Sequence, residues 1–309
     1  MSRDRSDTAT RHRTLRNRSL IASVGLSLVL IAAKLLAWLL GGSVAMLSSL
    51  LDSTLDGLSS LITVLSVYHA ARPADFNHRF GHAKAEPMAA FAQCIFISAS
   101  AFFVGYESLH RLIKPEPVDY TLFGIGVMLA STVGLLAVIA LQHRVVQVTG
   151  SMAIEAESLN YRGDLLLNLG VIGSLGITHM TGLPWVDPLF GIAIVGLLVR
   201  NSFVIGRRAL AVLMDEELDP AERERIRDAI LKHPKALGVH DLRTRHSGQC
   251  VFIEMHLEVD GSLSLHDAHD IATEVEDDLR RGWPGAEILI HQEPHGLEDE
   301  KLDIRIGTP

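Results

Sequence analysis

The chain has 309 residues, of which 48% are hydrophobic, with a mean hydropathy of +0.25 and a formal net charge of −8. This is apolar for a water-soluble protein, and the apolar residues are concentrated in the first two thirds of the chain. No basic face interleaves with aromatic side chains, which argues against nucleic-acid binding, and the two cysteines, Cys94 and Cys250, stand in dissimilar contexts that fit neither a disulfide framework nor a thiolate metal site.

Six long apolar segments follow a basic N-terminal arm, which we place at residues 1–18. Each segment has about 20 residues or more, the length that a helix needs to cross the hydrocarbon core of a bilayer. The first is too long for a signal peptide and lacks a small-residue cleavage site, so we expect none. The predicted spans of this membrane domain, residues 19–213, are Leu20–Leu40, Val44–Val67, Met88–Leu112, Leu122–Leu141, Met152–Thr178 and Pro188–Val212.

Basic residues mark one side of the predicted membrane domain, whereas the opposite side offers only Arg111 and Lys114. Because basic loops stay on the cytoplasmic side and six spans return the chain to its starting side, we expect both termini in the cytosol. The residues that carry this prediction are in the N-terminal arm, the second-to-third loop, the fourth-to-fifth loop and the exit from the sixth span: Arg3, Arg5, Arg11, Arg13, Arg16, Arg18, Arg72, Arg79, Lys84, Arg144, Arg207 and Arg208.

The pattern changes after Leu213, where short alternating segments replace the long apolar ones. The order helix–strand–strand–helix–strand in about 80 residues predicts a small cytosolic α+β domain at residues 214–295, with a polar tail at residues 296–309. The turn between the first two strands is expected at Ser247-Gly248. The predicted elements are the helix Asp219–Leu231, the strands Val239–Arg245 and Val251–Val259, the helix Leu265–Arg281 and the strand Ala286–His291.

Two pairs of polar residues lie inside predicted spans: Asp52 and Asp56 in the second, Asn160 and Asp164 in the fifth. Four residues make about one helical turn, so the members of each pair share a face. Insertion of an ionisable side chain at this depth of the membrane costs about 2.5–3.5 kcal/mol, so the presence of these residues calls for an explanation. Two inverted three-helix halves would bring the pairs together and offer four oxygen ligands to one divalent cation. The alternatives are that these residues cap helices, pair with Lys34 or line an inert polar seam.

A second group of candidate metal ligands lies in the loop after the second span. Asp75, His78 and His82 are residue types that bind zinc-like ions, and Pro73 and Gly81 indicate a bent chain around them. The alternative is a solvated polar loop without a metal.

A third group is formed by histidines of the predicted cytosolic domain. His256 and His291 become neighbours if their strands pair. The alternative is a set of ordinary, half-exposed histidines. The group comprises His240, His256, His266, His269, His291 and, just past the third strand, Glu293.

Five stretches together resemble one family. LLDSTLDGLSSL, RPADFNHRFGHAKAE, HDLRTRHSG, FIEMHLE and ILIHQEP occur in this order between about Ser19 and Pro294 and resemble the cation diffusion facilitator family, with the closest similarity to its bacterial YiiP-like (FieF-like) branch. The resemblance implies a homodimer of six-span protomers in the bacterial cytoplasmic (inner) membrane. Each protomer would carry a metallochaperone-like cytosolic domain and export a divalent metal ion in exchange for protons.

The resemblance also assigns site residues. It implies a transport site at Asp52, Asp56, Asn160 and Asp164 and a loop site at Asp75, His78 and His82. It further implies a binuclear cytosolic site, near the dimer interface, at His240, His256, His269, His291 and Glu293. Lys84 and Asp215 match a charged pair that helps to fix the membrane and cytosolic parts together.

Two positions depart from the family's pattern. Zinc-transporting members carry His where Asn160 stands, so the transport site here is all oxygen, which suits Mn²⁺ or Fe²⁺ better than Zn²⁺. Proton exchange would then rest on the three Asp side chains. Glu293 stands where close relatives have Asp, which moves the carboxylate by one methylene. The cytosolic histidines still favour a borderline ion such as Zn²⁺.

The sequence therefore predicts efflux of a divalent metal ion, Mn²⁺ or Fe²⁺, by proton antiport, with no cofactor besides the metal. There is no P-loop, HExxH, GxSxG or dinucleotide fingerprint, so neither ATP-driven pumping nor an enzyme is predicted. The alternatives are efflux of Zn²⁺ or Cd²⁺ by the same mechanism, a non-transporting membrane metal sensor or scaffold, and an intramembrane hydrolase that uses paired aspartates.

Overall fold

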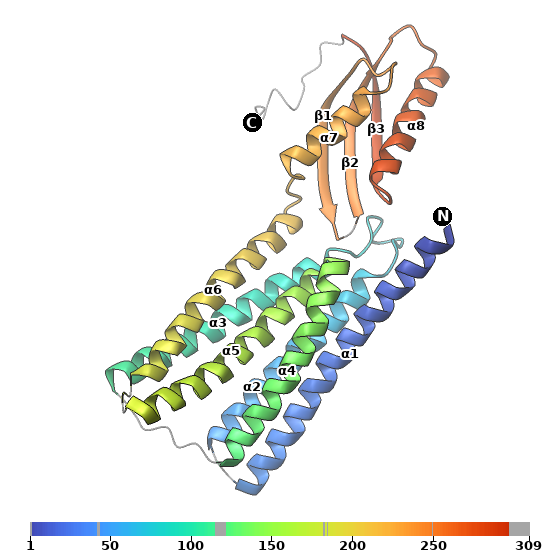
Figure 1. Ribbon diagram of the computed structural model, residues 1–309. Helices are drawn as coiled ribbons and strands as arrows, with labels where there is room; N and C mark the ends of the chain where they lie inside the picture. Colours follow the sequence, from blue (N-terminus) through green and yellow to red (C-terminus); the bar gives the residue numbers. More distant parts are fainter. Residues whose placement is uncertain are drawn as a thin grey trace. The chain divides into compact units, whose positions relative to one another are not determined.

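The computed structural model describes residues 2–41, 44–114, 122–181, 183, 185–248 and 250–296 (Figure 1). The chain divides into two compact units, one ending at Leu210 and the other beginning at Ala211, and each is described by itself. Apart from Gly296, the predicted polar tail lies outside the described residues.

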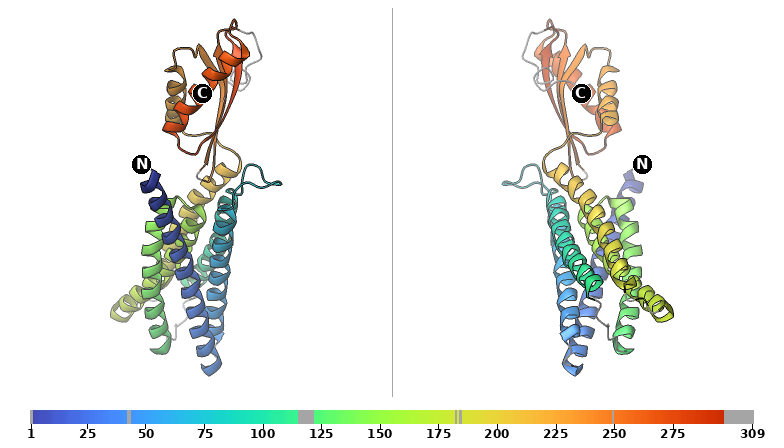
Figure 2. Two further views of the ribbon diagram at one scale, coloured as in Figure 1. Left: turned by 90° about the vertical axis from the view of Figure 1, so that its right-hand side faces the viewer. Right: turned by 90° about the vertical axis from the view of Figure 1, so that its left-hand side faces the viewer.

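Six long helices precede the first strand within the described residues, as the apolar segments predict, and they run lengthwise beside one another (Figure 2). The N-terminal arm continues the first helix, because it contains no Gly or Pro to interrupt it. The fourth helix continues past Leu141 to Gly150, whose φ of 62° ends it, so Arg144 lies on a helix and not in the predicted loop. The helices are α1 (Ser2–Gly41), α2 (Val44–Ala70), α3 (Ala85–Ile113), α4 (Leu122–Thr149), α5 (Met152–Thr181) and α6 (Val186–Leu213).

Five helices of the described part are long and apolar enough to cross a membrane. The remaining one, α5, has 30 residues and would reach about 45 Å, but it carries Glu155, Glu157, Arg162 and Asp164. The bundle exposes many large apolar side chains, as expected for a surface that faces lipid. The apolar spans cover Thr14–Leu36, Leu50–Ala70, Ala85–Ile113, Leu129–Thr149 and Pro188–Leu213.

Close packing of α3, α5 and α6 depends on small residues. Ala90, Ala101, Ala156 and Ala209 are buried in one cluster of these helices. Small side chains let helix backbones approach closely, which is the usual means of helix association where water does not drive it.

The second unit has the predicted order of elements: α7 (Pro220–Leu231), β1 (Gly238–Ser247), β2 (Cys250–Val259), α8 (Leu265–Gly282) and β3 (Glu287–Pro294). The sheet order is β1-β2-β3; β1 and β2 are antiparallel, and β2 and β3 are parallel. Gly248, with a φ of 61°, lies in the turn expected between β1 and β2. Because the connection from β2 to β3 is parallel, it needs a crossover, which α8 supplies.

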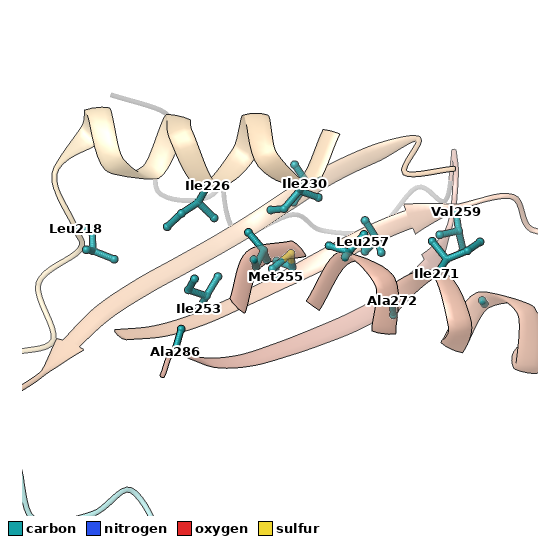
Figure 3. Packing of buried hydrophobic residues seen from close by; sticks show 14 residues of the cluster. Leu218, Ile226, Ile230, Ile253, Met255, Leu257, Val259, Ile271, Ala272 and Ala286 are labelled. Atoms are coloured by element: carbon teal, nitrogen blue, oxygen red, sulfur yellow. The ribbon is translucent and has the colours of Figure 1, made fainter. Parts of the chain in front are cut away.

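One face of this sheet forms the core of the unit (Figure 3). Ile253, Met255 and Leu257 alternate along β2 and pack with Ile230 of α7 and Ile271 of α8. Since successive strand residues point to opposite faces, the residues between them face away from both helices. The predicted ligands His240, His256 and His291 are on that other face.

Candidate metal centres

The intramembrane pairs lie on neighbouring helices. Asn160 Nδ2 of α5 donates a hydrogen bond to Asp56 Oδ1 of α2 at 2.8 Å. Asp52 and Asp164, each one turn away, are close enough to interact electrostatically with Asp56 and Lys34. The structure thus brings oxygen atoms from both predicted pairs toward one place, although their helices run in opposite directions.

Lys34 of α1 lies beside these carboxylates, and its Nζ donates to Ser53 Oγ at 2.7 Å. Lys34, which the sequence left open as a partner of these carboxylates, is therefore in electrostatic range of all three aspartates. The three aspartates and the ammonium group of Lys34 together carry a formal charge of −2, and Glu157 of α5 is a further carboxylate in electrostatic range of Asp56.

A buried polar network around Glu157 and Tyr161 of α5 was missed by the sequence reasoning. Glu157, 1% exposed, accepts hydrogen bonds at Oε2 from Gln142 Nε2 (2.9 Å) and Ser23 Oγ (3.4 Å). One turn further along α5, the Tyr161 hydroxyl lies 2.6 Å from Ser60 Oγ. These bonds join α1, α2, α4 and α5 around the carboxylates. The available sequence signal was a serine at every fourth position of α1: Ser19, Ser23 and Ser27.

The loop group is assembled around one carboxylate. Asp75 Oδ1 lies 3.2 Å from His78 Nδ1, and Asp75 Oδ2 lies 3.2 Å from His82 Nε2. The backbone N–H groups of Asn77 and His78 donate to Oδ1 and, with the His78 ring, hold the pKa of Asp75 below its ordinary value. Gly81, with a φ of 78°, allows the bend that returns His82 to Asp75.

His82 has an unsatisfied atom that is relevant to metal binding. The side chain is buried, and its Nδ1 has no hydrogen-bond partner among the described residues. The ring of His69 from α2 lies edge-on to it, with 4.7 Å between the ring centroids. Sequence reasoning did not place His69 here.

In the cytosolic unit, register places three histidines in one row across the sheet. His240 of β1 pairs with His256 of β2, and His256 pairs with His291 of β3. Glu293 lies two residues after His291 on the same face. Its Oε1 lies 2.7 Å from His256 Nδ1 and 3.5 Å from His291 Nε2, and its Oε2 lies 3.2 Å from His240 Nε2.

The predicted cytosolic set differs from the observed row at its edges. His269 is exposed on α8 and lies outside the three-residue ligand group of the described part, His240, His256 and Glu293. Glu258 and His295, which sequence reasoning missed, extend the row: His295 Nδ1 lies 2.7 Å from Glu258 Oε2. Glu258 is two residues after His256 on the same strand face, and this period-2 spacing could have identified it.

Two groups of three residues have the spacing of metal ligands. In each group, one ligand atom from every residue lies within 4.8 Å of the others; the groups are Asp75, His78 and His82 of the loop and His240, His256 and Glu293 of the cytosolic unit. Ligand atoms about 2.0–2.1 Å from a tetrahedral zinc ion are about 3.3 Å apart, close to the separations found here. His240 Nδ1 is buried without a hydrogen bond among the described residues, although Glu258 Oε1 lies 3.0 Å away. An unsatisfied buried nitrogen fits a site that gains a ligand.

Lys84 and Asp215 belong to different units, so their predicted pairing stays a prediction. Within its own unit, Asp215 Oδ1 accepts from Arg245 Nη1 at 3.2 Å.

Two family models together match most of the chain. Residues 20–214 match the cation efflux transmembrane domain, and residues 218–295 match the cytoplasmic domain of cation efflux proteins. The chain belongs to the cation diffusion facilitator family. The resemblance carried by the five sequence stretches is thereby confirmed.

Relatives match over nearly their full length. The cation-efflux pump FieF of Shewanella oneidensis is 43% identical over 90% of this chain and 93% of that protein. FieF of Salmonella arizonae is 39% identical over 90% and 92%, and protein p34 of Rickettsia rickettsii is 36% identical over 95% and 96%.

Two of the similar solved structures each match about a quarter of this chain. The zinc form of CzrB is 41% identical over 28% of this chain and 99% of that one, with a TM-score of 0.26. The cadmium form of a MamM CTD variant is 27% identical over 25% and 96%, with a TM-score of 0.24.

Proposed function

We propose that this protein exports a divalent metal ion across the bacterial inner membrane in exchange for protons, as a homodimer with both termini in the cytosol. Near-full-length relatives named cation-efflux pumps support the direction and the class of cargo. The observation that carries the proposal is the hydrogen bond between Asn160 of α5 and Asp56 of α2. Two further carboxylates, Asp52 and Asp164, are in electrostatic range of this contact.

The charge at this place matches the proposed cargo. The three aspartates and Lys34 carry a formal charge of −2, which is costly inside a membrane when it is not neutralised, and one divalent cation would neutralise it. Lys34 lowers the number of carboxylate charges that the metal must balance from three to two. A monovalent cation would leave one negative charge uncompensated.

Proton exchange follows from the same atoms. A carboxylate must be deprotonated to bind a cation, so metal binding at Asp52, Asp56 and Asp164 releases protons, and protonation releases the metal. Alternating exposure of this site to the two sides, by rocking of helix bundles around it, would couple the two flows without ATP.

The ligand set supports Mn²⁺ or Fe²⁺ as the cargo. Asn160 supplies an amide where an imidazole would favour zinc, so every donor in the set is oxygen. The alternative, Zn²⁺ or Cd²⁺, is favoured by a different observation: both groups outside the membrane contain imidazoles at ligand spacing. In our proposal those groups bind metal to regulate the transporter or to hold its parts together.

Transport by reconstituted protein tests the proposal. With an imposed pH gradient, liposomes containing the wild-type chain should accumulate metal and move protons in the opposite direction. Asp56→Asn and Asp164→Asn should abolish both flows. Metal uptake by either variant at the wild-type rate would refute the site, and metal binding without any flux would favour the sensor.

Selectivity is tested by a pair of matched substitutions on α5. Asn160→His should shift the Zn²⁺/Mn²⁺ uptake ratio toward zinc by about tenfold or more, because it adds an imidazole ligand. Asn168→His makes the same change two turns away, where Asn168 contacts Ser131 and Thr132, and should leave the ratio unchanged. Equal shifts in both variants would contradict the assignment of the cargo by ligand type.

A further inference from the structure

A groove of about 550 Å³ lies between the N-terminal half of α1 and the end of α2. Its inner wall is apolar, with Leu20 and Ile21 from α1 and Val64 from α2, and its rim carries Arg16 and Arg72. The size is within the range of ligand-binding pockets, about 300–1,000 Å³. No acidic residue is among the described residues that line it.

The groove is at the depth of a membrane surface. Ala70 ends one apolar span, and residues of the lining lie on both sides of this end, Tyr68 before it and Arg72 after it. Tyr68, 66% exposed, is also part of the lining, and tyrosine is enriched where acyl chains meet headgroups. The arginines therefore lie at headgroup level and the apolar wall at acyl-chain level.

The two arginines of the lining differ in their surroundings. Arg72 stacks on the Tyr68 ring, with 5.4 Å from Cζ to the ring centroid. Arg16 Nε is buried and has no hydrogen-bond partner among the described residues. Glu86 of α3 is close enough to attract Arg16, but its Oε2 also accepts from Ser151 Oγ at 2.5 Å. Because the single carboxylate of Glu86 can balance only one of the two arginines, the rim of the groove stays positive.

We propose that this groove binds an anionic phospholipid of the adjoining leaflet, with the phosphate between Arg16 and Arg72 and an acyl chain along Leu20, Ile21 and Val64. The charge of the rim selects an anionic headgroup, and the apolar wall selects a lipid over a soluble phosphate. An arginine near a membrane surface attracts an anionic lipid by about 1 kcal/mol, which is about fivefold in affinity. A bound lipid would tie the end of α2, and so the loop that carries Asp75, to α1.

Native mass spectrometry of the purified full-length protein in micelles tests this site. Wild-type protein titrated with phosphatidylglycerol and phosphatidylcholine should bind the anionic lipid about 25-fold more tightly. Arg72→Gln should reduce this preference about fivefold, and Arg16→Gln with Arg72→Gln should abolish it. The double change Arg16→Lys with Arg72→Lys keeps both charges and should retain most of it. Thermal unfolding of each variant checks its fold, and the exposed position of Arg72 keeps the single variant informative on its own.

Arg18→Gln is the matched control. Arg18 is exposed on the same helix at nearly the same depth, about 200° around the axis from Arg16, and it does not line the groove. If Arg18→Gln reduced the preference as much as Arg72→Gln, the attraction would be diffuse and the proposal wrong. Displacement of the lipid by millimolar glycerol phosphate would instead indicate a site for soluble phosphates, and it would equally overturn the lipid.

Discussion

Substitution of Glu293 should weaken zinc binding by the cytosolic row, and the resulting change in the zinc-induced rise of the melting temperature can be calculated. The two oxygens of Glu293 lie next to His240 and His256, and its side chain is buried. Zinc at 100 times its Kd stabilises a folded site by about 2.7 kcal/mol. For a domain of 60–100 residues, 1 kcal/mol shifts Tm by about 4–8 °C, so zinc should raise the Tm by about 11–22 °C. If Glu293→Gln weakens binding about 100-fold, the same zinc adds only about 0.4 kcal/mol, or about 2–3 °C.

The assay uses residues 211–296, whose buried core is made only of its own residues and which we expect to fold alone. Trp283 is the single tryptophan of this fragment and reports unfolding by fluorescence. Comparing each variant with and without zinc removes effects of the substitution on the metal-free fold. Glu287→Gln, the same change at an exposed position of the same strand, is the control. A zinc-induced rise in Glu293→Gln equal to that of wild type would refute the proposed site.

Three further predictions concern the loop, the core and the bundle. Asp75 lies 3.2 Å from a ring nitrogen of both His78 and His82, and its lowered pKa keeps its carboxylate charged at neutral pH, so Asp75→Asn should weaken Zn²⁺ binding at the loop about tenfold or more in calorimetric titrations at pH 7.5; an unchanged affinity would contradict this. Leu257→Ala, at a fully buried position, should lower the free energy of unfolding of the fragment by about 2–5 kcal/mol in urea titrations, whereas Leu289→Ala, at a position 66% exposed, should change it by less than about 0.5 kcal/mol. Tyr161→Phe removes a buried hydroxyl that contacts Ser60 and should lower the stability of the full chain in micelles by about 1 kcal/mol, and an unchanged melting temperature would show that this contact contributes nothing.

Repetitive features of the sequence predicted most of the fold. Long apolar runs predicted the helices of the membrane region, and alternation in residues 251–259 predicted β2, because burial on one face imposes a period of two. The row of histidines was only partly predictable. The neighbours His256 and His291 followed from strand pairing, but the place of His240 depends on a shift of register between His240 and Arg243, where Asp241 has a φ of 51°. An irregularity of this kind leaves no periodic trace in the sequence.

The intramembrane network shows a second limit of sequence reasoning. Glu157 and Gln142 are of different types on different helices, and Ser23 is 134 positions away from Glu157 in the chain. No local spacing relates such residues, so only the packing of the helices brings them together. The pairs Asp52–Asp56 and Asn160–Asp164 were visible because each lies within a single helical turn.

The polar content of α5 has a consequence for how this protein enters the membrane. Alone in lipid, Glu157, Arg162 and Asp164 would cost about 8–10 kcal/mol, whereas about ten aliphatic side chains return only about 3–6 kcal/mol. As a solitary segment, α5 would therefore not partition from the translocon into the bilayer. It has to leave the translocon together with earlier helices, whose Ser23, Asp56 and Gln142 contact polar side chains of α5. During biosynthesis, the polar groups of the earlier helices therefore make the insertion of α5 possible.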